Sequence, residues 1–255
     1  MIDDAEIRRR ASSLGVQQDH VERDYVLNHI LAHVSADPGS LIFRGGTALA
    51  RVYWPDFRLS EDLDFITPGS GEDIEGIERR AVRRAKETTG IELSLDFGAP
   101  RGDRSRSIVN WTTDWGSAGS LLIDVVRGEK PALSEEGREL NLPYSDLADD
   151  RALPVLSLAD ILGSKWGMLD ERDEPRDLFD VWFALRNASV PFEALASGHR
   201  ARYGYDPIPG FLTRAERLRR AWRERLAPQM KDLPDFDKVL RDVRSIVEEW
   251  EADRR

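Results

Sequence analysis

The chain has no cysteine among its 255 residues and only four histidines. Without thiols it can form no disulfide and no metal site that needs thiolate ligands. His29 and His33 are four residues apart and would share a helix face, but the neighbouring sequence supplies no further ligands for a zinc site. We therefore expect any bound metal to be held by carboxylate oxygens, which suits Mg²⁺ or Mn²⁺.

Long apolar segments are also missing. No run of eighteen apolar residues is present, so the sequence predicts no membrane span and no membrane partner. The first residues, Met1–Glu6, are acidic and are not followed by the apolar stretch of a secretory signal. With 40% hydrophobic and 33% charged residues, the composition is ordinary for a globular protein. We expect a cytoplasmic protein.

The charge balance is acidic, with 37 basic and 47 acidic residues and a net charge of −10. A protein that binds nucleic acid over much of its surface is usually basic, so such a protein is not expected here. Local basic patches can still bind a phosphate backbone on an acidic protein. Arginines cluster at 79–84, 101–106 and 214–225.

Hydrophobic periodicity predicts a mixed α/β half followed by an all-helical half. Strands are expected at 41–43, 63–66, 91–97, 106–115 and 121–126. Helices are expected at 2–14, 20–34, 72–88, 158–170, 176–187, 191–202, 211–226 and 235–252. The sequence therefore favours an α+β fold, with an α/β domain at 1–150 and a helical domain at 151–255.

Asp62 and Asp64 form the first candidate site, because alternate residues of a strand point to one face, roughly 7 Å apart. Two carboxylates repel each other unless a cation or a proton joins them. Two metal ions about 4 Å apart would use both groups. Asp124 is a candidate third ligand, since a lone carboxylate in the apolar run 121–126 is costly. The alternative is an acidic strand edge with Asp124 at its rim.

Gly45, Gly46 and Thr47 stand between an apolar strand and a helical stretch. Backbone N–H groups in such a turn can bind a phosphate, and a helix N-terminus adds to the attraction. Arg44, immediately before the turn, would contact the same phosphate. A tight strand-to-helix turn beside a solvated surface arginine explains the same residues.

A second charged block begins in the helical half. Lys165 and Arg172 are seven residues apart, which predicts that one helix face carries both and binds a triphosphate. Asp177 and Asp180 are predicted on the side of the next helix that faces away from its apolar stripe. There Asp177 would orient a cation or act as a base. A salt-bridged helical hairpin is the alternative.

Together these blocks resemble the AbiEii/AbiGii toxin family, which includes the MenT nucleotidyltransferases. The family pattern is Gly-Gly-Thr-x-Leu, then Arg-x-Ser-x-Asp-x-Asp, then a pair of helices with Lys…Arg-x-x-x-(Lys/Arg)-Asp-x-x-Asp. The matching segments of this sequence are Gly45–Leu49, Arg58–Asp64, Lys165–Arg172 and Arg176–Asp180. Each motif alone is loose, but their order and joint presence are specific.

The resemblance implies a polymerase-β-like nucleotidyltransferase with a mixed β-sheet core, flanking helices and a helical C-terminal region that contributes to the active site. Asp62 and Asp64 would bind Mg²⁺ or Mn²⁺, and an acceptor hydroxyl would attack the α-phosphate of an NTP. Asp124 fits the third carboxylate of the wider superfamily. The remaining implied roles are phosphate contacts by Gly46, Thr47 and Ser60, and a functional lysine and aspartate at Lys165 and Asp177.

The family also implies partners. The acceptor would be the 3′ end of a tRNA, and the chain would be paired with an antitoxin, an AbiEi-like winged-helix protein. The arginines at 214–225 would dock the RNA, although they equally suit the wet face of an amphipathic helix. Other readings remain open: nucleotidylation of a protein or of a small molecule such as an aminoglycoside, a catalytically silent nucleotide- or RNA-binding module, and a nuclease.

Overall fold

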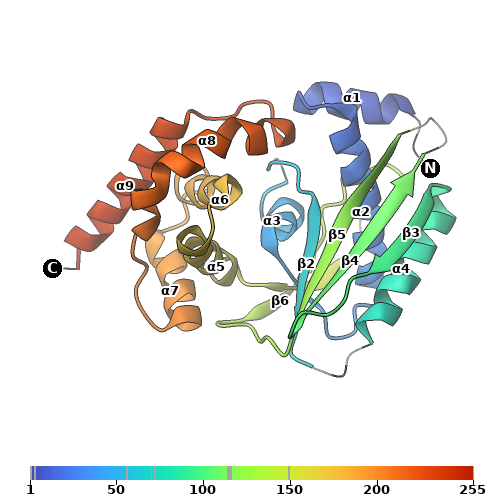
Figure 1. The fold of residues 1–255 in the computed structure, drawn as a ribbon, viewed down its shortest axis with the longest axis horizontal. Helices are drawn as coiled ribbons and strands as arrows, with labels where there is room; N and C mark the ends of the chain where they lie inside the picture. The colour runs from blue at the N-terminus through green and yellow to red at the C-terminus, as the bar shows by residue number, and fades with distance from the viewer. Residues whose placement is uncertain are drawn as a thin grey trace. The chain divides into compact units, whose positions relative to one another are not determined.

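The computed structural model describes residues 2, 4–55, 57–69, 71, 73–113, 117–148 and 150–254. The chain divides into two compact units (Figure 1). The first contains Met1–Lys130 and Glu135–Leu156, and the second contains Pro131–Ser134 and Ser157–Arg255. Because the last strand of the first unit ends at Leu156, the units meet in sequence slightly after the boundary expected at residue 150.

The first unit is built on a seven-stranded sheet in the order β3-β4-β5-β2-β1-β7-β6 (Figure 1). Its strands are β1 (Ile42–Arg44), β2 (Asp62–Thr67), β3 (Glu92–Phe97), β4 (Arg104–Thr112), β5 (Ala118–Arg127), β6 (Glu135–Glu139) and β7 (Ala152–Leu156). β2 is parallel to β5 and β1 is parallel to β7, whereas the other neighbouring pairs are antiparallel. This mixed sheet, with helices, confirms the expected α+β class.

The expected strands agree with β1 to β5 to within a few residues, but β6 and β7 were not expected. All residues of β6 are exposed, as is common for a charged edge strand, so no alternation of apolar residues marks it. β7 is short and apolar and directly precedes α5, so its sequence equally suits the lead into a helix. The expected strand 106–115 ends earlier in the structure, as β4 stops at Thr112, and Trp115 lies outside the described residues.

Within its described residues the first unit contains the α-helices α1 (Asp4–Leu14), α2 (Gln18–Ala36), α3 (Gly45–Ala48) and α4 (Ile74–Thr89). α2 and α4 pack against each other and against one face of the sheet (Figure 1). A π-helical turn, Leu49–Tyr53, follows α3 and places Arg51 in the interior, where it pairs with the fully buried Asp24 of α2. The Tyr144 hydroxyl also donates to Asp24, at 2.8 Å. A buried charge network thus fixes this turn to α2.

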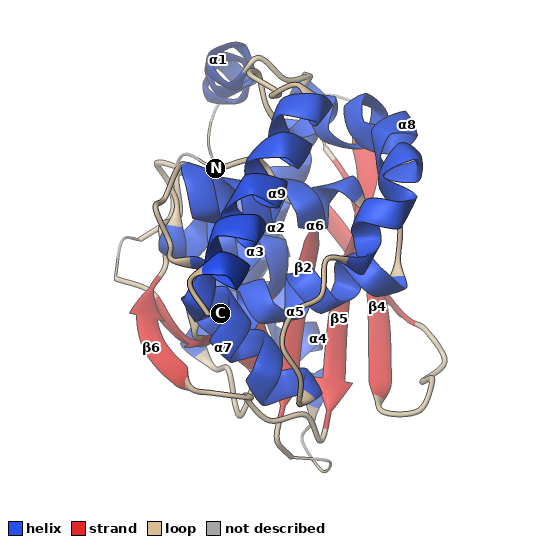
Figure 2. Cartoon of the chain, turned by 90° about the vertical axis from the view of Figure 1, so that its left-hand side faces the viewer, coloured by secondary structure: helices blue, strands red, loops and turns tan. Residues whose placement is uncertain are grey.

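The second unit is helical in its described part beyond Ser157 (Figure 2). Its α-helices are α5 (Leu158–Glu171), α6 (Pro175–Arg186), α7 (Phe192–Tyr203), α8 (Ala215–Leu226) and α9 (Phe236–Ala252), with 3-10 turns at Gly210–Arg214 and Ala227–Gln229. These agree with the expected helices, except that the one expected at 211–226 begins with a 3-10 turn. None of the helices in the described residues is both long and apolar enough to cross a membrane.

Asp160 explains why residues 131–134 belong to the second unit. Its carboxylate accepts hydrogen bonds from the backbone N–H groups of Ala132, Leu133 and Ser134 at 2.9–3.1 Å. Its own backbone N–H is donated to the Ser157 hydroxyl, which caps α5. The first turn of α5 therefore holds the segment that crosses from the sheet.

Candidate active site

Asp62, Asp64 and Asp124 share one face of the sheet. On β2 the intervening Leu63 and the following Phe65 are buried, so the two aspartates point to the opposite face. β2 and β5 pair in parallel with Asp64 directly beside Asp124, and in-register neighbours point to the same side. The structure therefore brings together the three carboxylates that the sequence analysis selected as metal ligands.

Arg106 of β4 lies next to these carboxylates. It is the register partner of Asp124, and its Nη2 donates a hydrogen bond to Asp124 Oδ2 at 2.6 Å. Hydrogen bonding and attraction to Asp124, with smaller contributions from Asp62 and Asp64, raise the pKa of the Arg106 guanidinium. In the sequence Arg106 is recognisable only as part of a basic cluster, because cross-strand register is not visible there.

The other oxygen of Asp124 has a different environment. Oδ1 is buried and accepts no hydrogen bond from any described residue, while Arg104 Nε lies 3.8 Å from it. A buried carboxylate oxygen that accepts no hydrogen bond is available to coordinate a cation. The all-oxygen character of the three carboxylates fits Mg²⁺ or Mn²⁺.

The three carboxylates are not held in a ready-made metal geometry. Among the described residues, no group of three or more His, Cys, Asp or Glu side chains is arranged to hold a metal ion. The contact between Arg106 and Asp124 directs one oxygen of Asp124 toward a guanidinium. The residues fit a divalent cation in chemistry, and Asp124 would have to change partner to bind one.

Gly45 lies in the left-handed region, with a φ of 82°. A Cβ at this position would come within 2.3 Å of Asp64 Oδ2, closer than real Cβ atoms approach other atoms. Two independent features therefore require glycine at position 45: the left-handed backbone conformation and the Asp64 carboxylate beside it. The turn of the Gly-Gly-Thr motif is thus in direct van der Waals proximity to the Asp64 carboxylate.

Gly46 has two polar neighbours. A Cβ there would meet Arg58 Nη2 at 2.8 Å and Ser60 Oγ at 3.3 Å. Arg58 is buried, donates to the Leu59 carbonyl, and lies over the Phe57 ring. In the sequence Arg58 belongs to the second motif but has no predicted role. Its position beside Gly46 and Ser60 makes it a further member of the site.

Thr47 and Arg44 are already engaged in other contacts. Thr47 is fully buried, and its hydroxyl donates to the Asp62 carbonyl at 2.5 Å, so it ties α3 to β2. Arg44 is the register partner of Asp64 and forms an ion pair with Glu129 at 2.8 Å. A direct phosphate contact by either residue stays a prediction.

Lys165, Arg172, Asp177 and Asp180 form a separate cluster in the second unit. Lys165 Nζ lies 2.6 Å from Asp180 Oδ2 and 3.2 Å from Asp177 Oδ1. Arg172 binds Asp177 with two nitrogens, at 2.9 and 3.2 Å. Asp177 thus joins the lysine to the arginine, which makes the cluster a salt-bridged pair of helices.

Two details of this cluster differ from the expectation. α5 ends at Glu171, so Arg172 is not on the same helix face as Lys165 but in extended backbone, and Asp177 brings the two together. Asp177 and Asp180 are buried, at 1% and 0% exposure, rather than on an open helix side. Two buried carboxylates require a counter-charge, which the buried Lys165 supplies. Because of this pairing, Asp177 and Asp180 are buried although they lie outside the apolar stripe of α6.

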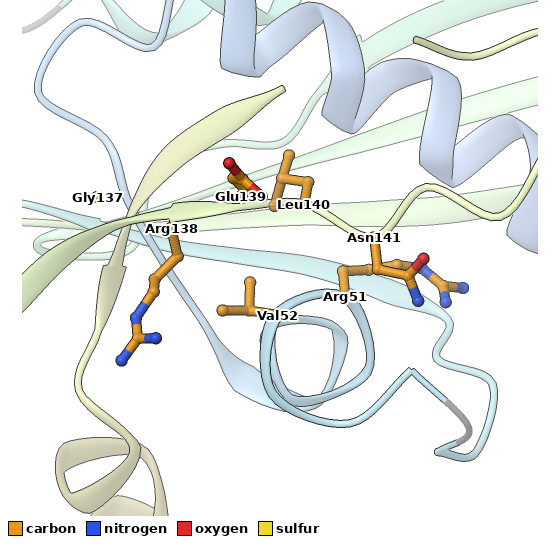
Figure 3. Close-up of a pocket in the computed structure, with 7 residues that line it drawn as sticks. All are labelled: Arg51, Val52, Gly137, Arg138, Glu139, Leu140 and Asn141. Atoms are coloured by element: carbon orange, nitrogen blue, oxygen red, sulfur yellow. The ribbon is translucent and has the colours of Figure 1, made fainter. Parts of the chain in front are cut away.

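A surface depression of about 540 Å³ lies elsewhere on the first unit (Figure 3). It is lined by Arg51, Val52, Gly137, Arg138, Glu139, Leu140 and Asn141. None of the three clustered carboxylates and neither glycine of the Gly-Gly-Thr turn is among these residues. The depression is therefore distinct from the candidate site.

The chain is similar to known proteins in sequence and in structure. Residues 29–248 match the family model described as nucleotidyl transferase AbiEii toxin, type IV TA system. JHP933 from Helicobacter pylori has a similar structure, with a TM-score of 0.62 and 16% sequence identity, over 94% of this chain and 96% of that chain. MenT4, a nucleotidyltransferase toxin from Mycobacterium tuberculosis, gives a TM-score of 0.59 and 18% identity over 96% and 88%. No curated protein matches the sequence.

Proposed function

Because the chain belongs to the AbiEii family of nucleotidyltransferase toxins, we propose that it transfers a nucleotide from an NTP to the 3′ end of a tRNA, using divalent metal ions bound by Asp62 and Asp64. Family membership makes the chain a nucleotidyltransferase of a toxin–antitoxin system. The metal ions and the acceptor are the parts that we propose.

The observation that carries the proposal is the alignment of carboxylates across β2 and β5. Asp62, Asp64 and Asp124 offer oxygen ligands on one sheet face, and Asp64 touches the glycine turn at Gly45. Bound Mg²⁺ or Mn²⁺ would stabilise the charge that develops on the α-phosphate as pyrophosphate leaves. The backbone at Gly46, which Arg58 and Ser60 approach closely, would border the phosphates.

Lys165 and Arg172 are the proposed triphosphate-binding cations of the second unit. Arg172 is half exposed and can reach an anion, whereas Lys165 is largely buried against two aspartates. Asp177, which contacts both side chains, would then orient Lys165 and Arg172 and would not act as a base. This assigns Lys165 and Asp177 the roles implied by the family motif, with Asp180 as the balancing charge.

The basic face of α8 is the proposed docking site for RNA. Leu218, Trp222 and Leu226 form the buried stripe of this helix. Arg220, Arg223 and Arg225 are exposed, and the described residues provide no ion pair for them. The remaining arginines of the cluster are engaged: Arg214 donates to the Leu169 carbonyl, while Arg217 and Arg219 pair with Asp173 and Asp237. Exposed unpaired arginines are suited to a phosphate backbone.

The test is incubation of the purified protein with each α-labelled NTP and total RNA, followed by separation on a sequencing gel. We expect label in RNA of tRNA length, extended by one or a few nucleotides. The Asp62→Ala variant should show no transfer. Label that enters protein or small molecules but never RNA contradicts the tRNA acceptor, and shortened RNA indicates a nuclease.

The docking surface has its own test. Reversing charge at Arg220 and Arg223 to Glu should raise the KM for tRNA at least tenfold and leave the KM for NTP within about twofold. The matched control is Arg83→Glu on the exposed face of α4, which should change neither. An equal effect of both variants contradicts docking on α8.

The proposed partner is a cognate antitoxin of winged-helix type. Membership of a type IV toxin–antitoxin family supports the antitoxin, and its winged-helix type is part of the proposal. Expression of the chain alone should inhibit growth, and co-expression of a cognate winged-helix antitoxin should restore it. Growth inhibition by the Asp62→Ala variant contradicts a toxicity that depends on nucleotide transfer and favours a binding module.

A further inference from the structure

A permanent cation lies against one of the proposed metal ligands. Arg106 Nη2 binds Asp124 Oδ2 at 2.6 Å, and antiparallel pairing of β4 with β5 keeps the two residues opposite each other. Along the same row, Asp64 stands between Asp124 and Arg44. The two central carboxylates of this row are therefore flanked by an arginine on each side.

We propose that Arg106 is a built-in counter-cation of the carboxylate site, which a divalent metal ion must displace from Asp124 in order to bind. The inference rests on the metal site of the proposed function. In the absence of metal, Asp62, Asp64 and Asp124 would repel one another, and a guanidinium beside them offsets that repulsion. The same guanidinium then competes with the metal for an oxygen of Asp124.

The geometry favours displacement over joint binding. One oxygen of Asp124 is engaged by Arg106, and the other is buried without a hydrogen-bond donor among the described residues. A metal ion that took Asp124 into a common shell with Asp64 would come close to the guanidinium, and like charges at such distances repel strongly. Arg106 has a route away, because its side chain is 52% exposed.

Because a metal ion must displace Arg106 from Asp124, Arg106 lowers the affinity of the site for the metal. A bound metal gains Asp124 as a ligand but breaks the charged hydrogen bond between Arg106 and Asp124, so the net free energy of metal binding is less favourable. Removing the Arg106 guanidinium removes the hydrogen-bonded competitor and its share of the repulsion together, whereas Arg104 Nε stays 3.8 Å from the other oxygen of Asp124. We expect Arg106→Gln to bind Mn²⁺ about tenfold more tightly than the wild type, which follows from losing a half-exposed ion pair and one nearby positive charge.

The experiment measures Mn²⁺ binding to the full chain without nucleotide, by the electron paramagnetic resonance signal of free Mn²⁺. Five proteins are compared: the wild type, Arg106→Gln, Arg106→Lys, Arg101→Gln and Asp124→Asn. The lysine variant keeps the charge without the planar fork and should fall between the wild type and Arg106→Gln. Arg101 has no described contact with Asp124, so its variant removes an equal charge and should bind like the wild type.

A second readout guards against misfolding of the variants. Mn²⁺ should raise the thermal unfolding temperature of Arg106→Gln by more than that of the wild type, since this variant binds Mn²⁺ more tightly without the Arg106 guanidinium on Asp124. Unchanged or weaker Mn²⁺ binding by Arg106→Gln overturns the inference. If wild type binds Mn²⁺ and Asp124→Asn does not, the proposed metal site survives that failure. If no protein binds Mn²⁺, both proposals fail.

Discussion

Replacing Gly45 by alanine perturbs the candidate site at a single atom. The backbone at Gly45 has a φ of 82°, and an L-residue in the left-handed region costs about 1–2 kcal/mol. In addition, the new Cβ would lie 2.3 Å from Asp64 Oδ2, less than the 3.0 Å below which real Cβ atoms essentially never approach a neighbour. The Asp64 carboxylate must therefore move.

Gly204 offers a matched control. Its φ is 83°, and no heavy atom lies within 4 Å of where its Cβ would be. Gly204→Ala therefore carries the same backbone cost without displacing a carboxylate. Gly204→Ala should lose about 1–2 kcal/mol of unfolding free energy in urea, and Gly45→Ala should lose at least as much. Only Gly45→Ala should lose activity, by about 100-fold, since displacing a reacting group by about 1 Å costs that much.

The assay is steady-state nucleotide transfer alongside urea unfolding for both variants. A Gly45→Ala enzyme within about threefold of the wild-type kcat would refute the reasoning, because Asp64 could then be moved without consequence. Equal activity losses in Gly45→Ala and Gly204→Ala would also refute it. In that case the loss would come from stability and not from the site.

Two further predictions concern charges buried in the first unit. Arg51→Ala leaves Asp24 buried without its counter-charge, so urea unfolding should show a loss of about 3–5 kcal/mol of unfolding free energy. The control Arg83→Ala changes an exposed residue and should lose less than about 0.5 kcal/mol. Similar losses in the two variants would contradict the buried network. Burial raises the pKa of Glu78 to about 7, against 4.5 in the unfolded chain, although a hydrogen bond from Ser107 lowers it. The folded protein thus keeps a proton that the unfolded chain releases, and stability should fall by about 3 kcal/mol as pH rises from about 4.5 to 7. Glu78→Gln should remove this fall in unfolding measured between pH 5 and 8, and an unchanged pH profile would contradict the assignment.

Much of the first unit was predictable because its strands follow simple patterns. Leu63 and Phe65 alternate with Asp62 and Asp64, so the sequence itself shows which residues share a face. The apolar run 121–126 likewise marks β5 and isolates Asp124 as its one charge. The structure adds that β2 and β5 are neighbours, which sequence periodicity does not reveal.

The contacts that depend on register were not predictable. Arg106 meets Asp124 because β4 and β5 form an antiparallel pair, and a slip of one residue would turn Arg106 to the other face. Asp177 and Asp180 looked like an exposed helix side because they are polar. They are buried because Lys165, on the preceding helix, supplies a charge that the pattern of α6 does not contain.

The central claim is that the Asp62 and Asp64 site transfers a nucleotidyl group. The most direct measurement supplies the same NTP labelled either at the α- or at the γ-phosphate, with Mg²⁺ and total RNA. The account predicts α-label in RNA, γ-label in released pyrophosphate, and neither product with Asp64→Asn. Gamma-label in the RNA, or full transfer by Asp64→Asn, would contradict it.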